Sequence, residues 1–192
     1  MRARLALLVL LGAVLASVPP VAALPPVAPT PAAAGYWLVA SDGGVFAMGG
    51  APFYGSTGNV VLNKPVVGLT ATPTGKGYWL VASDGGIFSF GDAAFFGSTG
   101  NVKLNRPVVG MAATPTGGGY WPVASDGGIF SFGDAGFFGS AGGQVLKGPI
   151  VGMAPTPTGR GYWLVGSDGA VFNFGDAASL GTLAGTRLAR PM

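Results

Sequence analysis

The 192-residue sequence contains no cysteine, no histidine and no glutamate. Without cysteine, neither a disulfide framework nor a thiolate site can form in any compartment. Without histidine, the side chain that most often serves as general acid or base is missing, and Asp supplies all seven acidic groups. Phosphate-binding loops are also missing, because no Gly-x-Gly-x-x-Gly or Gly-Lys-Ser/Thr string occurs. We therefore expect no cofactor, no metal site and no catalytic residues.

Charged residues are scarce, at 9% of the chain, and the N-terminus is mostly apolar. Arg2 and Arg4 precede an apolar run over residues 5–16 and a small-residue segment that ends at Ala23. This pattern is typical of a secretory signal peptide and is too short for an ordinary membrane span. We predict that residues 1–23 are removed and that residues 24–192 form one exported domain with no membrane span. A retained membrane anchor is the alternative.

Removal of the leader would leave the chain almost neutral. Eight of the ten Lys and Arg would remain against seven Asp, a net charge of +1. Nucleic-acid binding needs a clustered basic face, which this balance does not favour. We therefore expect no nucleic-acid partner.

The rest of the chain repeats one motif at a fixed step. The dipeptide Tyr-Trp begins at Tyr36, Tyr78, Tyr120 and Tyr162, a step of 42 residues each time. A constant step of this size is the signature of a repeat architecture. The 36 Gly and 16 Pro recur at fixed places in the repeat, which is not a low-complexity pattern.

Each repeat contains four short strand candidates, which in the second copy are residues 66–71, 78–83, 86–90 and 94–97. Asp84-Gly85 between two apolar runs predicts a β-hairpin with a type I′ turn. Residues 78–83 are apolar on both faces, as in a small sheet between two others. We therefore predict an all-β fold, a β-propeller of four four-stranded blades. Gly68, Gly110 and Gly152 would then lie where the inner strands crowd.

The two ends of the chain suggest how a ring would close. Ala28-Pro29-Thr30-Pro31 has a counterpart three repeats later at Ala154-Pro155-Thr156-Pro157. We predict that residues 24–31 complete the last blade by lying inside strands of residues 162–181. Pro25 and Pro26 argue against this because proline donates no ladder hydrogen bond. An open stack of four sheets is the alternative.

The 17-residue string of residues 77–93, Gly-Tyr-Trp-Leu-Val-Ala-Ser-Asp-Gly-Gly-Ile-Phe-Ser-Phe-Gly-Asp-Ala, resembles a family repeat. It is similar to the tandem repeat of secreted bacterial proteins, actinobacterial ones especially, in the Kelch-like and quinoprotein-like β-propeller group. The resemblance covers residues 35–192 and implies an exported propeller at the cell surface or outside the cell. It implies no catalytic residues. Pro122 and the Ser179-Leu180 pair depart from the pattern.

Two sets of Asp recur, one at Asp42, Asp84, Asp126 and Asp168 and one at Asp92, Asp134 and Asp176. Either set could bind Ca²⁺ or a polar ligand through carboxylate oxygens. Stabilisation of a turn by the Asp side chain is the simpler interpretation, because a dedicated Ca²⁺ loop alternates several oxygen ligands. The Tyr-Trp pairs fit core packing better than a sugar platform, because they fall in the middle of a strand.

The sequence thus favours a non-catalytic interaction module that binds a protein or a cell-wall polysaccharide. The alternatives are a carbohydrate-binding propeller and a hydrolase or lyase that uses paired Asp. Loops at strand ends carry binding in such scaffolds. The Asp-Gly hairpins and the long links should share one rim, which would hold Lys64, Lys103, Arg106, Lys147, Arg187, Arg190, Asp42, Asp84, Asp126 and Asp168. That rim is the predicted binding surface, although charges of mixed sign can also serve only solubility.

Overall fold

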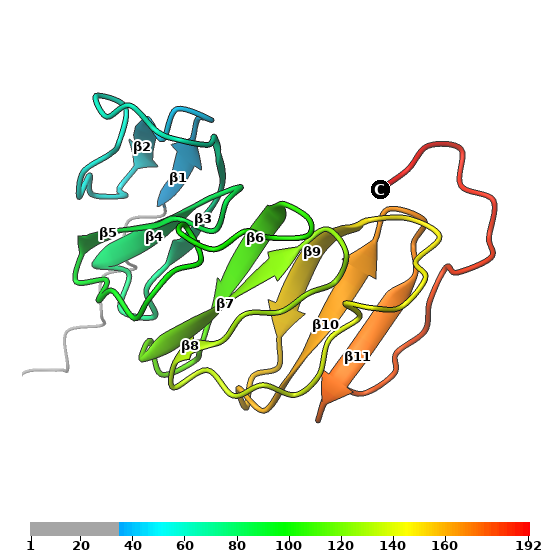
Figure 1. Ribbon diagram of the computed structural model, residues 1–192. Helices are drawn as coiled ribbons and strands as arrows, with labels where there is room; N and C mark the ends of the chain where they lie inside the picture. The colour runs from blue at the N-terminus through cyan, green and yellow to red at the C-terminus, as the bar shows by residue number, and fades with distance from the viewer. Residues whose placement is uncertain (1–34) are drawn as a thin grey trace, which may run out of the picture. The chain divides into compact units, whose positions relative to one another are not determined.

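Residues 35–192 are described by a computed structural model and contain β-strands, turns and loops but no helix. Within these residues, eleven strands form four antiparallel sheets, one for each repeat (Figure 1). The sheets are β1 (Gly35–Val39) with β2 (Val45–Gly49); β3 (Val66–Ala71), β4 (Gly77–Ala82) and β5 (Ile87–Gly91); β6 (Val108–Ala113), β7 (Gly119–Ala124) and β8 (Phe132–Gly133); β9 (Ile150–Pro155), β10 (Gly161–Gly166) and β11 (Val171–Gly175). The prediction of an all-β fold with four blade-like sheets is confirmed. In the described part of the chain, no helix is long and apolar enough to cross a membrane.

The hairpin between the second and third strand of each repeat has a different turn from the one predicted. Gly85 has φ of +79°, but no residue other than glycine has a positive φ among the described residues. The amide of Gly85 donates to Ala82 O, and the amide of Ala82 donates to Gly86 O, at 2.8 Å each. This is a three-residue loop that ends in a left-handed glycine, whereas a type I′ turn requires positive φ at both central residues. Asp84 therefore keeps an ordinary backbone conformation.

Successive sheets pack face to face in chain order. The first strands of neighbouring three-stranded sheets lie side by side, β3 against β6 and β6 against β9, while β1 lies against β3. Every residue of β4 and of β7 is buried, as predicted for strands with two apolar faces. Three core clusters lie between successive sheets, and they contain Leu80, Trp79 and Trp121 respectively. This is the blade packing of β-propellers.

The fourth strand candidate of each repeat is not a strand. Residues 94–97 belong to no sheet, and the second, third and fourth sheets have three strands each. The backbone of this segment is instead bonded to side chains. Trp79 Nε1 donates to Ala94 O at 2.7 Å, and Tyr120 Oη donates to Gly97 O and accepts from the Phe96 amide. The segment is thus a strap between its own sheet and the next one.

Ring closure is not shown by the described residues. No strand of the first sheet is in extensive contact with a strand of the last sheet. Residues 24–31, which we predicted to complete the last sheet, lie outside the described residues, as do residues 1–23. The place beside β10 that the prediction gave them is occupied by β9, because the sheet order is β11-β10-β9.

The expected reason for the glycines of the first strands is only partly right. A Cβ on Gly68 would lie 3.3 Å from Val81 Cγ1, but a Cβ on Gly110 would meet nothing within 4 Å. Crowding therefore does not explain Gly110.

Candidate functional site

The Asp-Gly hairpins and the long links between sheets lie at one end of the strands. We call this surface the hairpin rim; it comprises hairpins 41–44, 83–86, 125–128 and 167–170 and links 56–65, 98–107, 140–149 and 182–191. Backbone hydrogen bonds join its parts: the amide of Ser83 donates to Pro65 O at 2.9 Å, and that of Thr99 donates to Gly85 O at 3.2 Å. The same bonds recur in the other repeats, so the rim is periodic.

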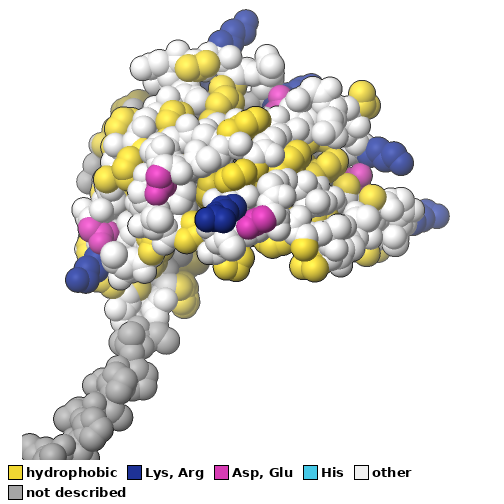
Figure 2. Space-filling view, turned by 90° about the horizontal axis from the view of Figure 1, so that it is seen from below, with side chains coloured by type: hydrophobic (Ala, Val, Ile, Leu, Met, Phe, Trp, Pro, Cys, Tyr) yellow, Lys and Arg dark blue, Asp and Glu magenta, His cyan; other side chains and the backbone are white. Residues whose placement is uncertain are grey.

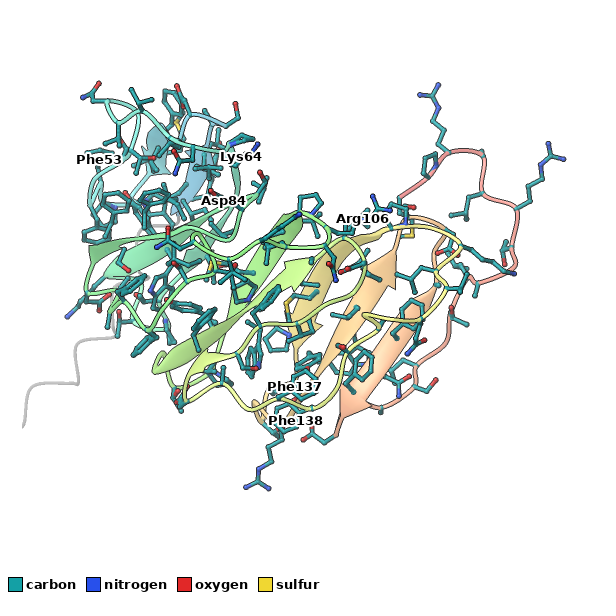
Figure 3. The ribbon with its side chains drawn as sticks, viewed as in Figure 1. Phe53, Lys64, Asp84, Arg106, Phe137 and Phe138 are labelled. Atoms are coloured by element: carbon teal, nitrogen blue, oxygen red, sulfur yellow. The ribbon has the colours of Figure 1, made fainter. Side chains whose placement is uncertain are left out.

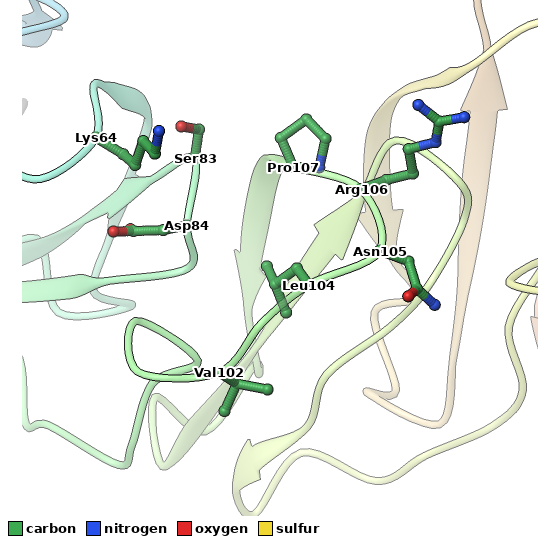
Figure 4. A pocket seen from close by; sticks show the side chains of 8 residues that line it. All are labelled: Lys64, Ser83, Asp84, Val102, Leu104, Asn105, Arg106 and Pro107. Carbon is green, nitrogen blue, oxygen red and sulfur yellow. The ribbon is translucent and has the colours of Figure 1, made fainter.

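Hollows recur along this rim, each between a hairpin and a link. The hollow of the second repeat has a volume of about 370 Å³ and is lined by Lys64, Ser83, Asp84, Leu104 and Arg106, among others (Figure 4). Equivalent hollows lie at Asp42, at Asp126 and at Asp168. Their walls mix carboxylates, basic side chains and proline.

Basic side chains connect neighbouring hollows. Lys64 lines the hollows of both Asp42 and Asp84, and Arg106 lines those of both Asp84 and Asp126. Lys147 does the same for Asp126 and Asp168. In Figure 3, Lys64, Asp84 and Arg106 lie along the same edge of the molecule. The rim is therefore a row of alternating charges.

The remaining predicted rim residues are placed less centrally. Lys103, Arg187 and Arg190 are exposed on links of the hairpin rim but line none of these hollows.

The hairpin carboxylates each have a structural task. Asp84 Oδ1 accepts a hydrogen bond from the Gly86 amide at 3.0 Å, and Asp126 and Gly128 form the same bond. Asp42 and Asp168 use their Oδ1 atoms in the same way. This is the turn-stabilising role that Asp commonly plays beside glycine. Because the bond fixes one oxygen, the carboxylate is held in place beside the basic side chains of the hollow.

The second set of Asp lies at the other end of the strands, beside the Thr-Pro-Thr-Gly turns. We call this surface the threonine rim, and it comprises turns 72–76, 114–118 and 156–160 with Asp92, Asp134 and Asp176. Thr72 and Thr74 donate through their Oγ1 atoms to Asp92. These hydrogen bonds, that from Thr74 foremost, lower the pKa of Asp92 below its ordinary value. Asp176 has its pKa lowered in the same way by Thr158 and Thr156.

The two sets of Asp thus do not meet. Among residues 35–192, no three acidic side chains come close enough together to hold a metal ion. Because the two sets lie at opposite ends of the strands, an Asp of one set does not pair with an Asp of the other. Both sets instead hydrogen bond to the backbone or side chains of their own turns.

Aromatic side chains divide into a buried and an exposed group. Tyr78, Trp79, Tyr120, Trp121 and Tyr162 are completely buried, which confirms the core-packing role predicted for the Tyr-Trp pairs at these positions, but the prediction is wrong for Tyr36, which is 59% exposed. Burial raises the pKa of the three tyrosine hydroxyls above the usual 10.0.

An exposed row of phenylalanines was missed by the sequence reasoning. Phe53, Phe95 and Phe137 occupy the same place in three repeats, and each leaves about three-fifths of its surface in solvent, 59%, 60% and 63%. In Figure 3, Phe137 lies at the end of its repeat opposite to Arg106. The Phe95-Phe96 and Phe137-Phe138 pairs were a signal for this row, because successive side chains of an extended segment point to opposite sides and only one ring of each pair can pack inward.

Comparison with known proteins finds similar solved structures but no family model and no curated relative. No family model matches the sequence, and no curated protein matches it. Among solved structures, the chain is similar to the β-propeller domain of Cps50 (Swd1) from Myceliophteria thermophila, with 11% sequence identity and a TM-score of 0.43. The match covers 75% of this chain and 48% of the other, so this chain spans about half the length of the chain that it matches.

Proposed function

We propose that the chain is an exported, non-catalytic interaction module that binds a polar, anionic polymer of the cell wall along its hairpin rim. The observation that carries the proposal is the row of hollows that share Lys64, Arg106 and Lys147. A repeating row of cations suits a repeating polyanion, because each repeat of the protein can meet one unit of the polymer. Several weak contacts on one scaffold then add to a useful affinity.

The charges of the rim favour binding over chemistry. The Asp of each hollow is already bonded to a backbone amide, and no histidine is available to act with it. Lys64 and Arg106 are exposed and free to reorient toward a ligand. Contacts of this kind are weakened by salt because exposed charges are screened within about 10 Å at 0.1 M ionic strength.

A pair of matched double variants tests this role. Lys64→Ser/Arg106→Ser removes two positive charges from the hairpin rim, and Lys76→Ser/Arg160→Ser removes two from the threonine rim. We expect the first variant to elute from purified bacterial cell walls at clearly lower salt than the wild type, and the second to elute with the wild type. Equal elution of the two variants would exclude the hairpin rim as the binding surface.

A second candidate function rests on the exposed row of Phe53, Phe95 and Phe137. Aromatic faces stack on the apolar faces of sugar rings, so this row favours a carbohydrate-binding module. Replacement of Phe95 and Phe137 by Ala should then abolish retention on neutral glycans at any salt, with the melting temperature unchanged. If these replacements leave glycan binding intact, the phenylalanine row has no such role.

A further inference from the structure

Each boundary between consecutive sheets is built around one tyrosine of the later sheet. Tyr78 Oη donates to Gly55 O at 2.6 Å and accepts from the Tyr54 amide at 3.2 Å, so it bonds both ways to the strap of the preceding repeat. Tyr120 and Tyr162 make the same two bonds to the straps of the second and third repeats. A hydroxyl that both donates and accepts in a buried place holds the two sheets in a fixed register.

The same tyrosine packs against a tryptophan of the preceding sheet. Ring centroids of the pairs Trp37–Tyr78, Trp79–Tyr120 and Trp121–Tyr162 are 5.5, 5.6 and 5.8 Å apart. Each strap also has a glycine with positive φ against which a phenylalanine of the next sheet lies. A Cβ on Gly97 would be only 2.6 Å from Phe132 Cδ1. The same set of contacts therefore forms all three boundaries.

The first sheet has the tyrosine side of such a boundary, but no described sheet precedes it. Tyr36 occupies the place of Tyr78, yet it is 59% exposed where Tyr78 is fully buried. Leu38, Phe46 and Met48 lie beside it on the same face of β1 and β2 and are exposed as well. No described strand covers them. The first sheet thus presents an apolar face that includes a tyrosine whose hydroxyl has no hydrogen-bond partner among residues 35–192.

The last sheet carries the other half. Leu180 and Gly181 occupy the places of Phe96 and Gly97, and Leu180 is 84% exposed. Gly181 keeps a positive φ of +113°, close to the +130° of Gly97, but a Cβ there would meet nothing within 4 Å. Trp163 still bonds its own strap through Nε1 to Ala178 O at 2.7 Å. The strap is therefore already in the conformation that receives a tyrosine.

We propose that the last sheet of one copy of this chain binds the first sheet of a second copy, head to tail. The Tyr36 hydroxyl of the second copy would donate to Gly181 O and accept from the Leu180 amide, with its ring against Trp163. The interface would continue the three internal boundaries at the same spacing, with Leu180 in the place of Phe96 and Met48 in the place of Phe90. A head-to-tail contact closes into a ring when its rotation allows. Two copies would supply eight sheets, the upper end of the usual propeller range of 4–8 blades.

The binding partner is a second copy of this chain because the exposed face of the first sheet is complementary to the strap of the last sheet, whereas neither surface is complementary to itself. A face-to-face contact between two first sheets would bring two tyrosine faces together and leave both straps without a partner. Within one chain, the first and last sheets are not in extensive contact in the described residues. Figure 2 shows that hydrophobic side chains are also scattered over one face of the molecule.

Two single variants test the proposal through the oligomeric state of the full chain. Tyr36→Asp places a charge in one half of the interface, and Leu180→Asp places a charge in the other half. We expect the wild type to reach twice the chain mass in sedimentation equilibrium as its concentration rises, and each variant alone to remain monomeric. Val145→Asp, at a fully exposed link position, introduces the same charge and should dimerise like the wild type.

A mixture of the two variants gives the sharpest result. The intact strap of the Tyr36→Asp chain can still receive the intact tyrosine of the Leu180→Asp chain, so the mixture should form a one-to-one dimer. A wild type that stays monomeric at every concentration would overturn the proposal, whether the cause is closure within one chain or cover by residues 1–34. So would a Leu180→Asp chain that dimerises like the wild type, because that result indicates contact between first sheets.

Discussion

At the scale of single residues, the stability of the stacked sheets depends on buried hydroxyls that hydrogen bond to backbone groups. Tyr120 Oη satisfies both Gly97 O and the Phe96 amide, two groups that no strand partner satisfies. Removal of one partner from a buried hydrogen bond leaves the other group desolvated and unpaired. The tyrosine hydroxyl therefore stabilises the fold by satisfying two buried backbone groups at once.

Tyr120→Phe should lower the free energy of unfolding by about 1–3 kcal/mol, because it leaves those two backbone groups unpaired. Tyr36→Phe is the matched control, since the same atom is removed from an exposed ring. Urea unfolding at low protein concentration measures both. Equal effects of the two changes would contradict the role given to the boundary tyrosine.

The hydrogen-bonded carboxylates of the threonine rim lead us to expect that the folded protein loses stability in acid. The pKa of the Asp92 and Asp176 carboxyls is lowered in the folded state by hydrogen bonds from threonine hydroxyls. A lowered folded-state pKa means that the stabilisation is complete above the ordinary value of 3.8 and is lost as the pH falls through the folded-state pKa. The melting temperature should therefore fall below pH 3.8, and Asp92→Asn/Asp176→Asn should reduce that slope. An unchanged slope in this double variant would show that other groups cause the acid dependence.

At the scale of strands and straps, position in the stack decides what the same residue contributes. Leu80 and Leu38 hold equivalent places in β4 and β1, but Leu80 is fully buried between two sheets while Leu38 is 51% exposed. Burial on both faces arises from the neighbouring repeats and not from the strand itself.

Leu80→Ala should cost about 2–5 kcal/mol of unfolding free energy, the range for truncation of a buried leucine. Leu38→Ala should cost well under half as much, because the exposed side chain leaves no cavity. Chemical unfolding of the two variants under the same conditions gives the comparison. Comparable losses would mean that the first sheet is covered as fully as the second.

The sequence was enough to predict most elements of the fold, but not all. The 42-residue step and the two-faced apolar strands predicted sheets packed on both sides, as β4 and β7 are. Residues 94–97 look like a strand because they are apolar and lie between turn signals. Their partners are a tryptophan of their own repeat and a tyrosine of the next one, which no local pattern reveals.

The candidate site was also predictable from the sequence only in part. The shared rim of hairpins and links followed from antiparallel strand order, and the structure places Lys64, Asp84 and Arg106 around one hollow. Lys103 was predicted to belong to the binding rim, yet it lines none of the hollows. The sequence could not reveal this, because hydrogen bonds between consecutive repeats set the conformation of each link. The exposure of Phe95 was missed for a related reason: the strap, not a strand, sets which ring of the pair points outward.

At the scale of the whole molecule, four copies of one unit place like groups in register along two separate rims. Carboxylates on the hairpin rim alternate with cations that are shared between hollows, while those on the threonine rim are bonded to hydroxyls. A single site would give weak binding, whereas a row of equivalent sites favours an extended, repetitive ligand. We therefore expect the hairpin rim, and not the threonine rim, to bind the polymer.

Hydrogen exchange with and without a soluble anionic cell-wall polysaccharide distinguishes the two rims. Bound polymer should slow amide exchange in hairpin 83–86 and link 98–107 and in their equivalents in the third repeat, while turns 72–76 and 114–118 exchange at unchanged rates. Slowing confined to the threonine rim, or binding without slowing at either rim, would show that the hairpin rim does not bind the polymer.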